Sequence, residues 1–315
     1  ALLLNMYFLT SVVYTASVGA MLYLSRKYLD SSTGKSITRN LAQALPFLFV
    51  LSLYYIFFIE IKVYWEQLLI MSKVGVSVDK SNLENATHNW NLDILKNVWL
   101  YLYSLVFIIG ILSVNRFKIK NTQLSKYLVF GVLGAAFFFL TADLYNISTL
   151  RDNYLNQSQG EYYTIDYMNI ALRYISIAVF GAMVYLGTLE SKIFSNIKYY
   201  AVYKDIILHT IAVWLLTSEM IHWLDMYSDN QSYKLGISIL WGVYSLMLII
   251  IGIWKSRKHI RIAGFTLFSI TLVKLFFYDI STLDTISKTI IFVVIGLLLL
   301  VASYLYNKYT GKIDE

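Results

Sequence analysis

Long apolar stretches recur along the whole chain, and they constrain its fold more than any other feature. The 315 residues are 58% hydrophobic and only 14% charged, whereas ordinary soluble domains are about 25% charged. Each stretch is about 20 residues long, the length that a helix needs to cross a hydrocarbon core of about 30 Å. Because lipid offers the backbone no hydrogen bonds, each stretch must satisfy its own as a helix. The sequence therefore predicts an all-α integral membrane protein.

The hydropathy pattern predicts about nine transmembrane helices. Their expected ranges are 2–25, 41–63, 94–114, 124–145, 167–189, 204–226, 235–254, 260–278 and 287–306. The first range begins almost at Ala1 and shows no signal-peptide pattern, so we expect the chain to be part of a longer protein. The chain contains no cysteine, which excludes disulfides and thiolate metal sites.

Basic residues are concentrated in every second predicted loop. The loops after the first, third, fifth and seventh helices carry most of the lysines and arginines, and the C-terminal tail adds more. The formal net charge of +7 therefore belongs mainly to one side of the membrane and does not indicate nucleic-acid binding. The positive-inside rule places the N-terminus outside and the C-terminus in the cytoplasm. An odd number of crossings agrees with this orientation, since it puts the two ends on opposite sides.

The sequence contains an internal repeat. Ile147-Ser148-Thr149-Leu150 recurs as Ile280-Ser281-Thr282-Leu283, each time after an apolar stretch and a tyrosine. Further residues match at a spacing that changes only where polar loops lie: Glu60 with Glu219, Tyr64 with Trp223, Glu66 with Asp225, Trp99 with Trp241, Gly110 with Gly252, Gly131 with Gly264, Arg173 with Lys288, Gly181 with Gly296 and Thr188 with Ser303. We therefore expect one lone helix followed by two copies of a four-helix unit. An even number of helices makes the copies parallel, unlike an inverted repeat.

The repeat divides the chain into three expected parts. Residues 1–39 hold the first helix and a cytoplasmic loop, residues 40–194 the first four-helix unit, and residues 195–315 the second unit with the cytoplasmic tail. The two Ile-Ser-Thr-Leu runs are expected to be helix-joining turns at the outer face. In the second of them, Asp279 would end one helix and a Ser or Thr would cap the next.

Charged side chains inside the predicted helices give the candidate site, because charges are expensive in a membrane and mark substrate pathways and proton relays. The predicted orientation gathers them at the outer ends of the helices. The candidates for a substrate or proton pathway are Glu219, His222, Lys274, Asp279, Glu60 and Asp143. We therefore expect a polar outer vestibule that is built once in each unit.

Glu219 and His222 lie three positions apart and therefore share one helix face. The pair suits a proton relay, a general acid–base pair or two metal ligands. It equally suits a structural role, in which Glu219 pairs with Lys274 and His222 caps carbonyl groups. The first unit has Val63 where the second has His222, so the motif is not duplicated, and we expect neither a metal nor a cofactor. If the protein has one working site, this difference favours the second unit.

Four stretches in the C-terminal third resemble DUF2339, a bacterial family of predicted polytopic membrane proteins of unknown function. They are residues 216–225 (LTSEMIHWLD), 240–244 (LWGVY), 261–264 (RIAG) and 272–285 (LVKLFFYDISTLDT), within a similarity that covers about residues 214–306. The resemblance implies a multi-pass protein of the bacterial inner membrane and supports a role for Glu219, His222, Lys274 and Asp279. It implies no particular activity.

The sequence leaves three functions open. A transporter or flippase of an envelope-related substrate would use the charged outer vestibule, and this is the favoured interpretation. A scaffolding subunit of an envelope complex would use the same charges to hold helices together. A membrane-embedded enzyme at the periplasmic face would use Glu219 or His222 as a base, but no nucleophile elbow or metal cluster supports it. Expected partners are membrane lipids and either other subunits or the rest of a longer chain, with no nucleic acid.

Overall fold

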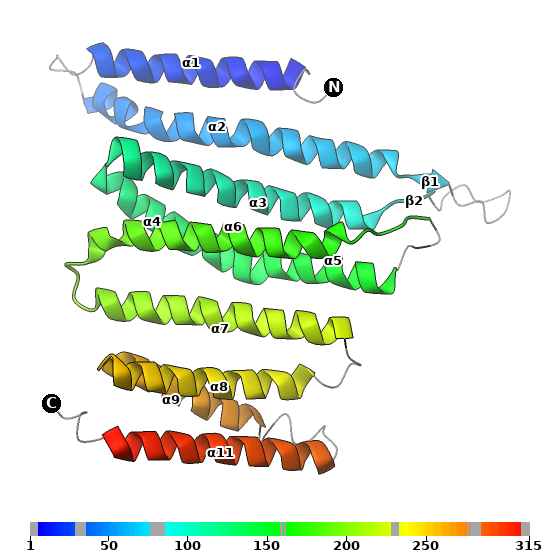
Figure 1. The fold of residues 1–315 in the computed structure, drawn as a ribbon. Helices are drawn as coiled ribbons and strands as arrows, with labels where there is room; N and C mark the ends of the chain where they lie inside the picture. The colour runs from blue at the N-terminus through cyan, green and yellow to red at the C-terminus, as the bar shows by residue number, and fades with distance from the viewer. Residues whose placement is uncertain are drawn as a thin grey trace. The chain divides into compact units, whose positions relative to one another are not determined.

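The computed structural model describes residues 6–28, 36–75, 86–157, 160, 162–227, 233–275, 277 and 285–309. These residues are almost entirely helical (Figure 1). The chain divides into two compact units, Ala1–Glu190 and Ser191–Glu315, and each is described by itself.

The first unit is built from helices and two π-helical turns. The helices are α1 (Met6–Tyr28), α2 (Ser36–Met71), α3 (Trp90–Val114), α4 (Thr122–Phe138), α5 (Leu144–Asn156) and α6 (Met168–Glu190). The π turn η1 (Asn115–Ile119) extends α3, and the π turn η2 (Phe139–Asp143) joins α4 to α5. A short antiparallel ladder pairs β1 (Val74–Gly75) with β2 (Ala86–Thr87), a small addition to the all-α fold that the sequence predicts.

The second unit begins with a 3-10 turn, η3 (Ser191–Phe194). Its helices are α7 (Tyr200–Tyr227), α8 (Tyr233–Trp254), α9 (Lys258–Lys274) and α11 (Thr285–Tyr309). α8 and α9 approach each other closely at two glycines. A Cβ at Gly252 would lie 2.7 Å from the backbone nitrogen of Arg261, and one at Gly264 would lie 2.9 Å from the Ser245 carbonyl oxygen.

Seven helical stretches in the described part of the chain are long and apolar enough to cross a membrane. They are Phe8–Ser25, Ala44–Met71, Trp90–Ile119, Thr122–Asn156, Met168–Phe194, Tyr200–Tyr227 and Gly236–Trp254. The other two expected crossings are present as helices. α9 has only 17 residues, and the apolar part of α11 is the shorter stretch Lys288–Val301. The chain is thus a multi-pass membrane protein, and the eighth and ninth crossings stay predictions.

The prediction that Ile147–Leu150 forms a helix-joining turn is wrong. This run lies inside α5, which continues to Asn156. Ile147 and Leu150 are buried against Val98 of α3 and Leu172 of α6, so tertiary packing keeps the segment helical beyond the apolar stretch. The second copy of the run, at 280–283, and the predicted cap at Asp279 lie outside the described residues.

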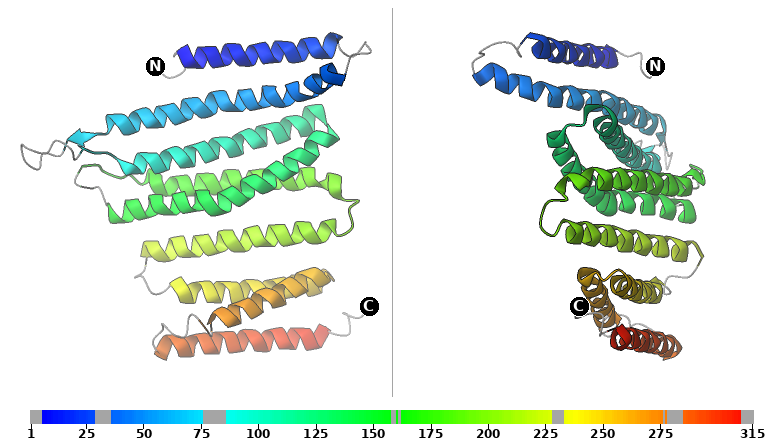
Figure 2. Two further views of the ribbon diagram at one scale, coloured as in Figure 1. Left: turned by 180° about the vertical axis from the view of Figure 1, so that it is seen from behind. Right: turned by 60° about the vertical axis from the view of Figure 1, so that its left-hand side comes forward.

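α6 packs antiparallel against the continuous helix α4–η2–α5 (Figure 2), and one register describes the whole contact. The contacts that fix it are Val132 against Gly187, the stacked rings of Phe139 and Phe180 at 4.1 Å between centroids, and the Asn169 side chain on the Leu150 carbonyl at 3.0 Å. Between one contact and the next, the residue number rises on α4–η2–α5 by the same amount as it falls on α6. The register therefore holds across the π turn as well.

Each unit has a central helix. In the first unit α3 packs against α2, α4, α5 and α6, and α1 packs on α2. In the second unit α8 packs against α7, α9 and α11. The apolar middle of the first unit therefore lies where α3, α4–η2–α5 and α6 meet.

Gly187→Ala is expected to destabilise the first unit. A Cβ at Gly187 would lie 2.7 Å from Cγ1 of Val132, and overpacking of this kind costs about 1–3 kcal/mol. Gly181→Ala on the same helix is the matched control, because a Cβ there meets nothing within 4 Å and alanine favours helix more than glycine does. Thermal unfolding of both variants in one detergent measures the difference. Equal unfolding temperatures would contradict the register.

Candidate functional site

The predicted site residues fall into two groups that belong to different units. Glu60 on α2 and Asp143 on η2 lie in the first unit, and both are buried. Glu219 and His222 on α7 and Lys274 at the end of α9 lie in the second. Asp279 is outside the residues that the structure describes. Each unit therefore has its own set of candidates.

In the second unit, polar contacts join α7, α8 and α9. His222 is 1% exposed, whereas Glu219 is half-buried. The Lys274 ammonium donates a hydrogen bond to the buried Ser238 hydroxyl on α8, at 2.8 Å. The indole of Trp241 donates to the Thr217 hydroxyl on α7, also at 2.8 Å. Sequence reasoning did not find Ser238, because a serine in an apolar helix does not stand out. The pairing of Glu219 with Lys274 stays a prediction.

A second polar cluster in this unit links α7 to the turn between α8 and α9. Asp205 accepts hydrogen bonds from Arg257 at 2.5 Å and from Nε2 of His259 at 2.8 Å. On the next turn of α7, Nδ1 of His209 lies 2.8 Å from the Tyr244 hydroxyl. These residues were not among the candidates, because the sequence places them beside a basic loop. These polar side chains are therefore hydrogen-bonded to one another. The contacts of Asp205 hold the start of α9 against α7, and the contact of His209 holds α8 against α7.

Three asparagines connect α3, α5 and α6 at one end of the first unit. The side-chain oxygen of Asn91 accepts from Asn169 at 2.8 Å and from Asn153 at 3.2 Å, and its amide nitrogen donates to Asn169 at 3.2 Å. Asn169 also donates to the Leu150 carbonyl. The buried amides of Asn91 and Asn169 therefore have partners for both their donor and acceptor atoms.

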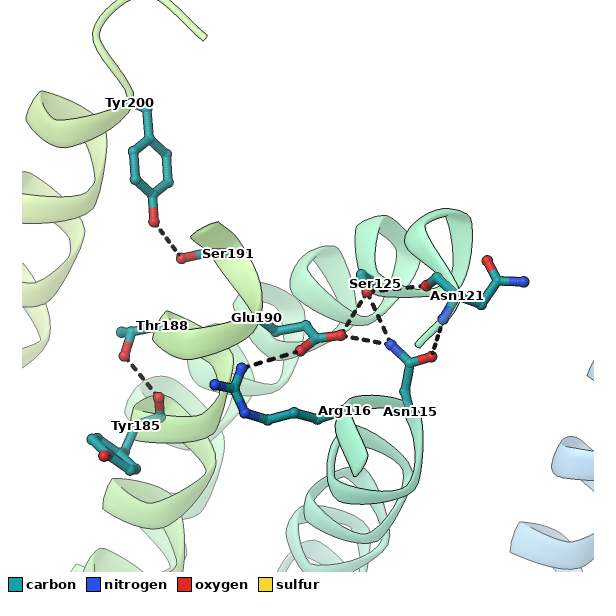
Figure 3. Close-up of polar contacts among 9 residues, drawn as sticks. All are labelled: Asn115, Arg116, Asn121, Ser125, Tyr185, Thr188, Glu190, Ser191 and Tyr200. Carbon is teal, nitrogen blue, oxygen red and sulfur yellow. Dashed lines mark hydrogen bonds and ion pairs between the residues drawn. The ribbon is translucent and has the colours of Figure 1, made fainter. Parts of the chain in front are cut away.

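A network around Glu190 closes the other end of the same helices (Figure 3). Asn115 on η1 and Ser125 on α4 each donate a hydrogen bond to Oε1 of Glu190, both at 2.6 Å. Arg116 lies 3.8 Å from Oε2, and the backbone N–H of Asn121 donates to Asn115. The charge of Glu190 is thus balanced at the end of α6, as a buried charge requires.

Asp143 lies between these two networks and differs from both. It is 0% exposed, and neither of its carboxylate oxygens has a hydrogen-bond partner within the described part of the chain. The shared register of the two helices puts Ser176 of α6 level with it. Ser176 is also 0% exposed, and its hydroxyl likewise has no partner among the described residues. Tyr101 of α3 is within electrostatic reach of Asp143.

The π turn η2 holds Asp143 in this position. A π turn contains one more residue than an α-helical turn, and such turns often occur at functional sites. The buried stripe of the helix widens here, because Phe139, Leu140, Asp143 and Leu144 are all buried. Hydropathy carries no signal for a π turn or for helix register, so the sequence could indicate the acid but not the serine at the same level.

The fold and these internal networks define a polytopic helical membrane protein. In such proteins polar groups inside the membrane are hydrogen-bonded between helices, as they are at both ends of the first unit. The family model described as "Predicted membrane protein (DUF2339)" matches residues 2–309. The chain therefore belongs to the DUF2339 family, and the similarity extends far beyond the C-terminal third. No curated protein and no solved structure matches the chain.

Asn169→Ala is expected to destabilise the protein by about 1–3 kcal/mol, because it leaves the amide nitrogen of the buried Asn91 without its acceptor. Asn146→Ala is the control, since no side-chain hydrogen bond of Asn146 ties helices together in the described residues. Thermal unfolding in detergent measures both. A loss of stability that is no larger for Asn169→Ala than for Asn146→Ala would show that the asparagine network contributes little.

Proposed function

We propose that this protein is a cation-coupled transporter of the bacterial cytoplasmic membrane that moves an envelope-related substrate, and that Asp143 binds the coupling cation. The observation that carries this proposal is the burial of Asp143 inside a membrane-length helix, with no hydrogen-bond partner for its carboxylate among the described residues. A carboxylate in such surroundings is costly unless a cation or a proton compensates its charge. Ionisable residues inside membrane helices are typical of ion and substrate pathways.

The proposed architecture is nine crossings, with the N-terminus outside and two parallel four-helix units after the first helix. Two features support the repeat. The second helix of each four-helix repeat, α3 in the first and α8 in the second, packs against the other three helices of the same repeat. A π turn follows α4 in the first unit, and Leu275 and Phe277 after α9 are also π-helical. Basic residues at alternate helix ends support the orientation.

The comparison of the two units favours a single cation site. By the spacing that relates Tyr145 to Tyr278, the residue that matches Asp143 is Phe276. The acid therefore occurs only in the first unit. This differs from the sequence-based expectation, which favoured the second unit because His222 has no counterpart in the first.

A scaffolding role is the second candidate. The asparagine network and the Glu190 network favour it, because they hold three helices together at both ends of the first unit. In that case Asp143 would be a static buried group. An enzyme with His222 as its base has less support, since a base must reach its substrate and His222 is buried.

Thiol accessibility separates a transporter from a scaffold, and the natural absence of cysteine makes single replacements clean reporters. We expect Ser176→Cys to react with a membrane-impermeant thiol reagent, because the level of Asp143 must open to water during transport. Met183→Cys is the matched control, being equally buried on the same face of α6. The labelled fraction measured by mass spectrometry should be at least about tenfold higher for Ser176→Cys. Equal protection of both would favour the scaffold.

The same cysteine-free chain tests the orientation. Lys120→Cys follows η1, and Tyr167→Cys precedes α6; both positions are exposed. With the N-terminus outside, an impermeant thiol reagent added to intact cells should label Tyr167→Cys, and should label Lys120→Cys only after the membrane is permeabilised. The reverse pattern would overturn the orientation without affecting the helix packing.

A further inference from the structure

We infer that the cation at Asp143 is a proton and that the site does not take a metal cation. Ser176, which makes no hydrogen bond to Asp143 in this structure, becomes its hydrogen-bonding partner when the proton binds. This inference rests on the proposed transport function and specifies its coupling ion. It is carried by the juxtaposition of two buried polar side chains on facing helices.

The register places Asp143 and Ser176 at one level. The Phe139–Phe180 stack lies one turn to one side, and the contact of Asn169 with the Leu150 carbonyl lies two turns to the other. Since the residue steps between these contacts are equal on both helices, the pair falls between them at the same height.

The hydroxyl of Ser176 suits both protonation states of the acid. A serine hydroxyl has one O–H donor and two acceptor lone pairs, whereas a carboxylate only accepts and a carboxylic acid also donates. Ser176 can therefore accept from the protonated form of Asp143 and donate to its ionised form. A proton arrives on a carboxylate oxygen and forms one O–H bond, and the same bond breaks when the proton leaves. No other bond or electron is involved.

The number of oxygen atoms disfavours a metal ion. Hard metal cations in proteins take about six or more oxygen ligands. At this level the side-chain oxygens that the described residues offer are the two of Asp143 and the hydroxyl of Ser176, with Tyr101 nearby. The buried side chains within about one turn of them on the same helices are the apolar Phe139, Leu140, Leu144 and Phe180 and the charged Arg173. A proton needs only one acceptor and one hydrogen-bond partner, which this set supplies.

Several charged and titratable groups lie on the helices that pack around this level, among them the buried Arg151 of α5 and Glu190 of α6. Tyr101 lies on α3, Arg173 lies on α6 one turn from Ser176, and the buried Glu60 lies on α2, which packs against α3. Arginine keeps its charge at any ordinary pH. A permanent ion pair of Asp143 with Arg173 is therefore the alternative to a proton site, and it predicts an acid that never becomes protonated.

Infrared spectroscopy of the whole protein in lipid nanodiscs tests the inference without knowledge of the substrate. A protonated carboxyl has its own C=O stretching band, and we expect this band to appear as the pH is lowered. It should be lost in Asp143→Asn, which keeps the shape of the protonated acid. In Ser176→Ala the band should shift to the frequency of a carboxyl without a hydrogen bond, whereas Ser176→Thr should restore the original position.

The probes are protons and Na⁺, with choline as the control cation. We expect the same pH dependence of the band in Na⁺ and in choline. Displacement of the band by Na⁺ alone would overturn the proton assignment and leave a cation-coupled transporter standing. Identical spectra of the wild type and Asp143→Asn at every pH would also overturn it, in favour of the ion pair. The transport function is tested separately: equal protection of Ser176→Cys and Met183→Cys from the thiol reagent would contradict it.

Discussion

The antiparallel contact between α6 and α4–η2–α5 is the interaction on which the rest of the first unit depends. Gly187 lets Val132 approach, and the Phe139–Phe180 stack fixes the height. A slip by one residue would turn the following side chains by about 100° around the helix axis. Glu190 would then leave Asn115, and the two buried groups at the middle of the contact would no longer lie level. One apolar seam thus sets the contacts of Glu190 and Asn169 and the common level of Asp143 and Ser176.

The polar groups along that seam differ in whether they have hydrogen-bond partners. In lipid a buried side-chain donor or acceptor must find its partner within the protein, and Asn91, Asn169 and Glu190 find theirs on other helices at the two ends. The carboxylate of Asp143 does not find one among the described residues. Complete networks hold helices in place, whereas an acid that lacks a protein partner is suited to a ligand that comes and goes. This contrast distinguishes the proposed transporter from a scaffold of similar fold.

Hydropathy located the helices well, because the cost of exposing backbone to lipid dominates at that scale. It located their ends poorly: α2 extends to Met71, because Glu66 and Gln67 lower the hydropathy there but favour helix. The Ile147–Leu150 run was misread because its helical state depends on packing against Val98 and Leu172. Asp143 was found as a charge in an apolar stretch. Ser176 was not, because an uncharged serine gains meaning only when another helix brings an acid to its level.

The π turn η2 rotates the side chains of the second half of the span Thr122–Asn156 around the helix axis relative to those of the first half. α4, η2 and α5 form one continuous span, yet the surplus residue advances everything after it by about 100° relative to an unbroken α-helix. Removing one residue from Phe139–Asp143 would leave the length of the span almost unchanged. It would nevertheless turn Ile147, Leu150 and the rest of α5 away from α3 and α6. The number of residues in this single turn therefore decides which side chains of α5 point toward α3 and α6. The composition of the chain does not reveal that number.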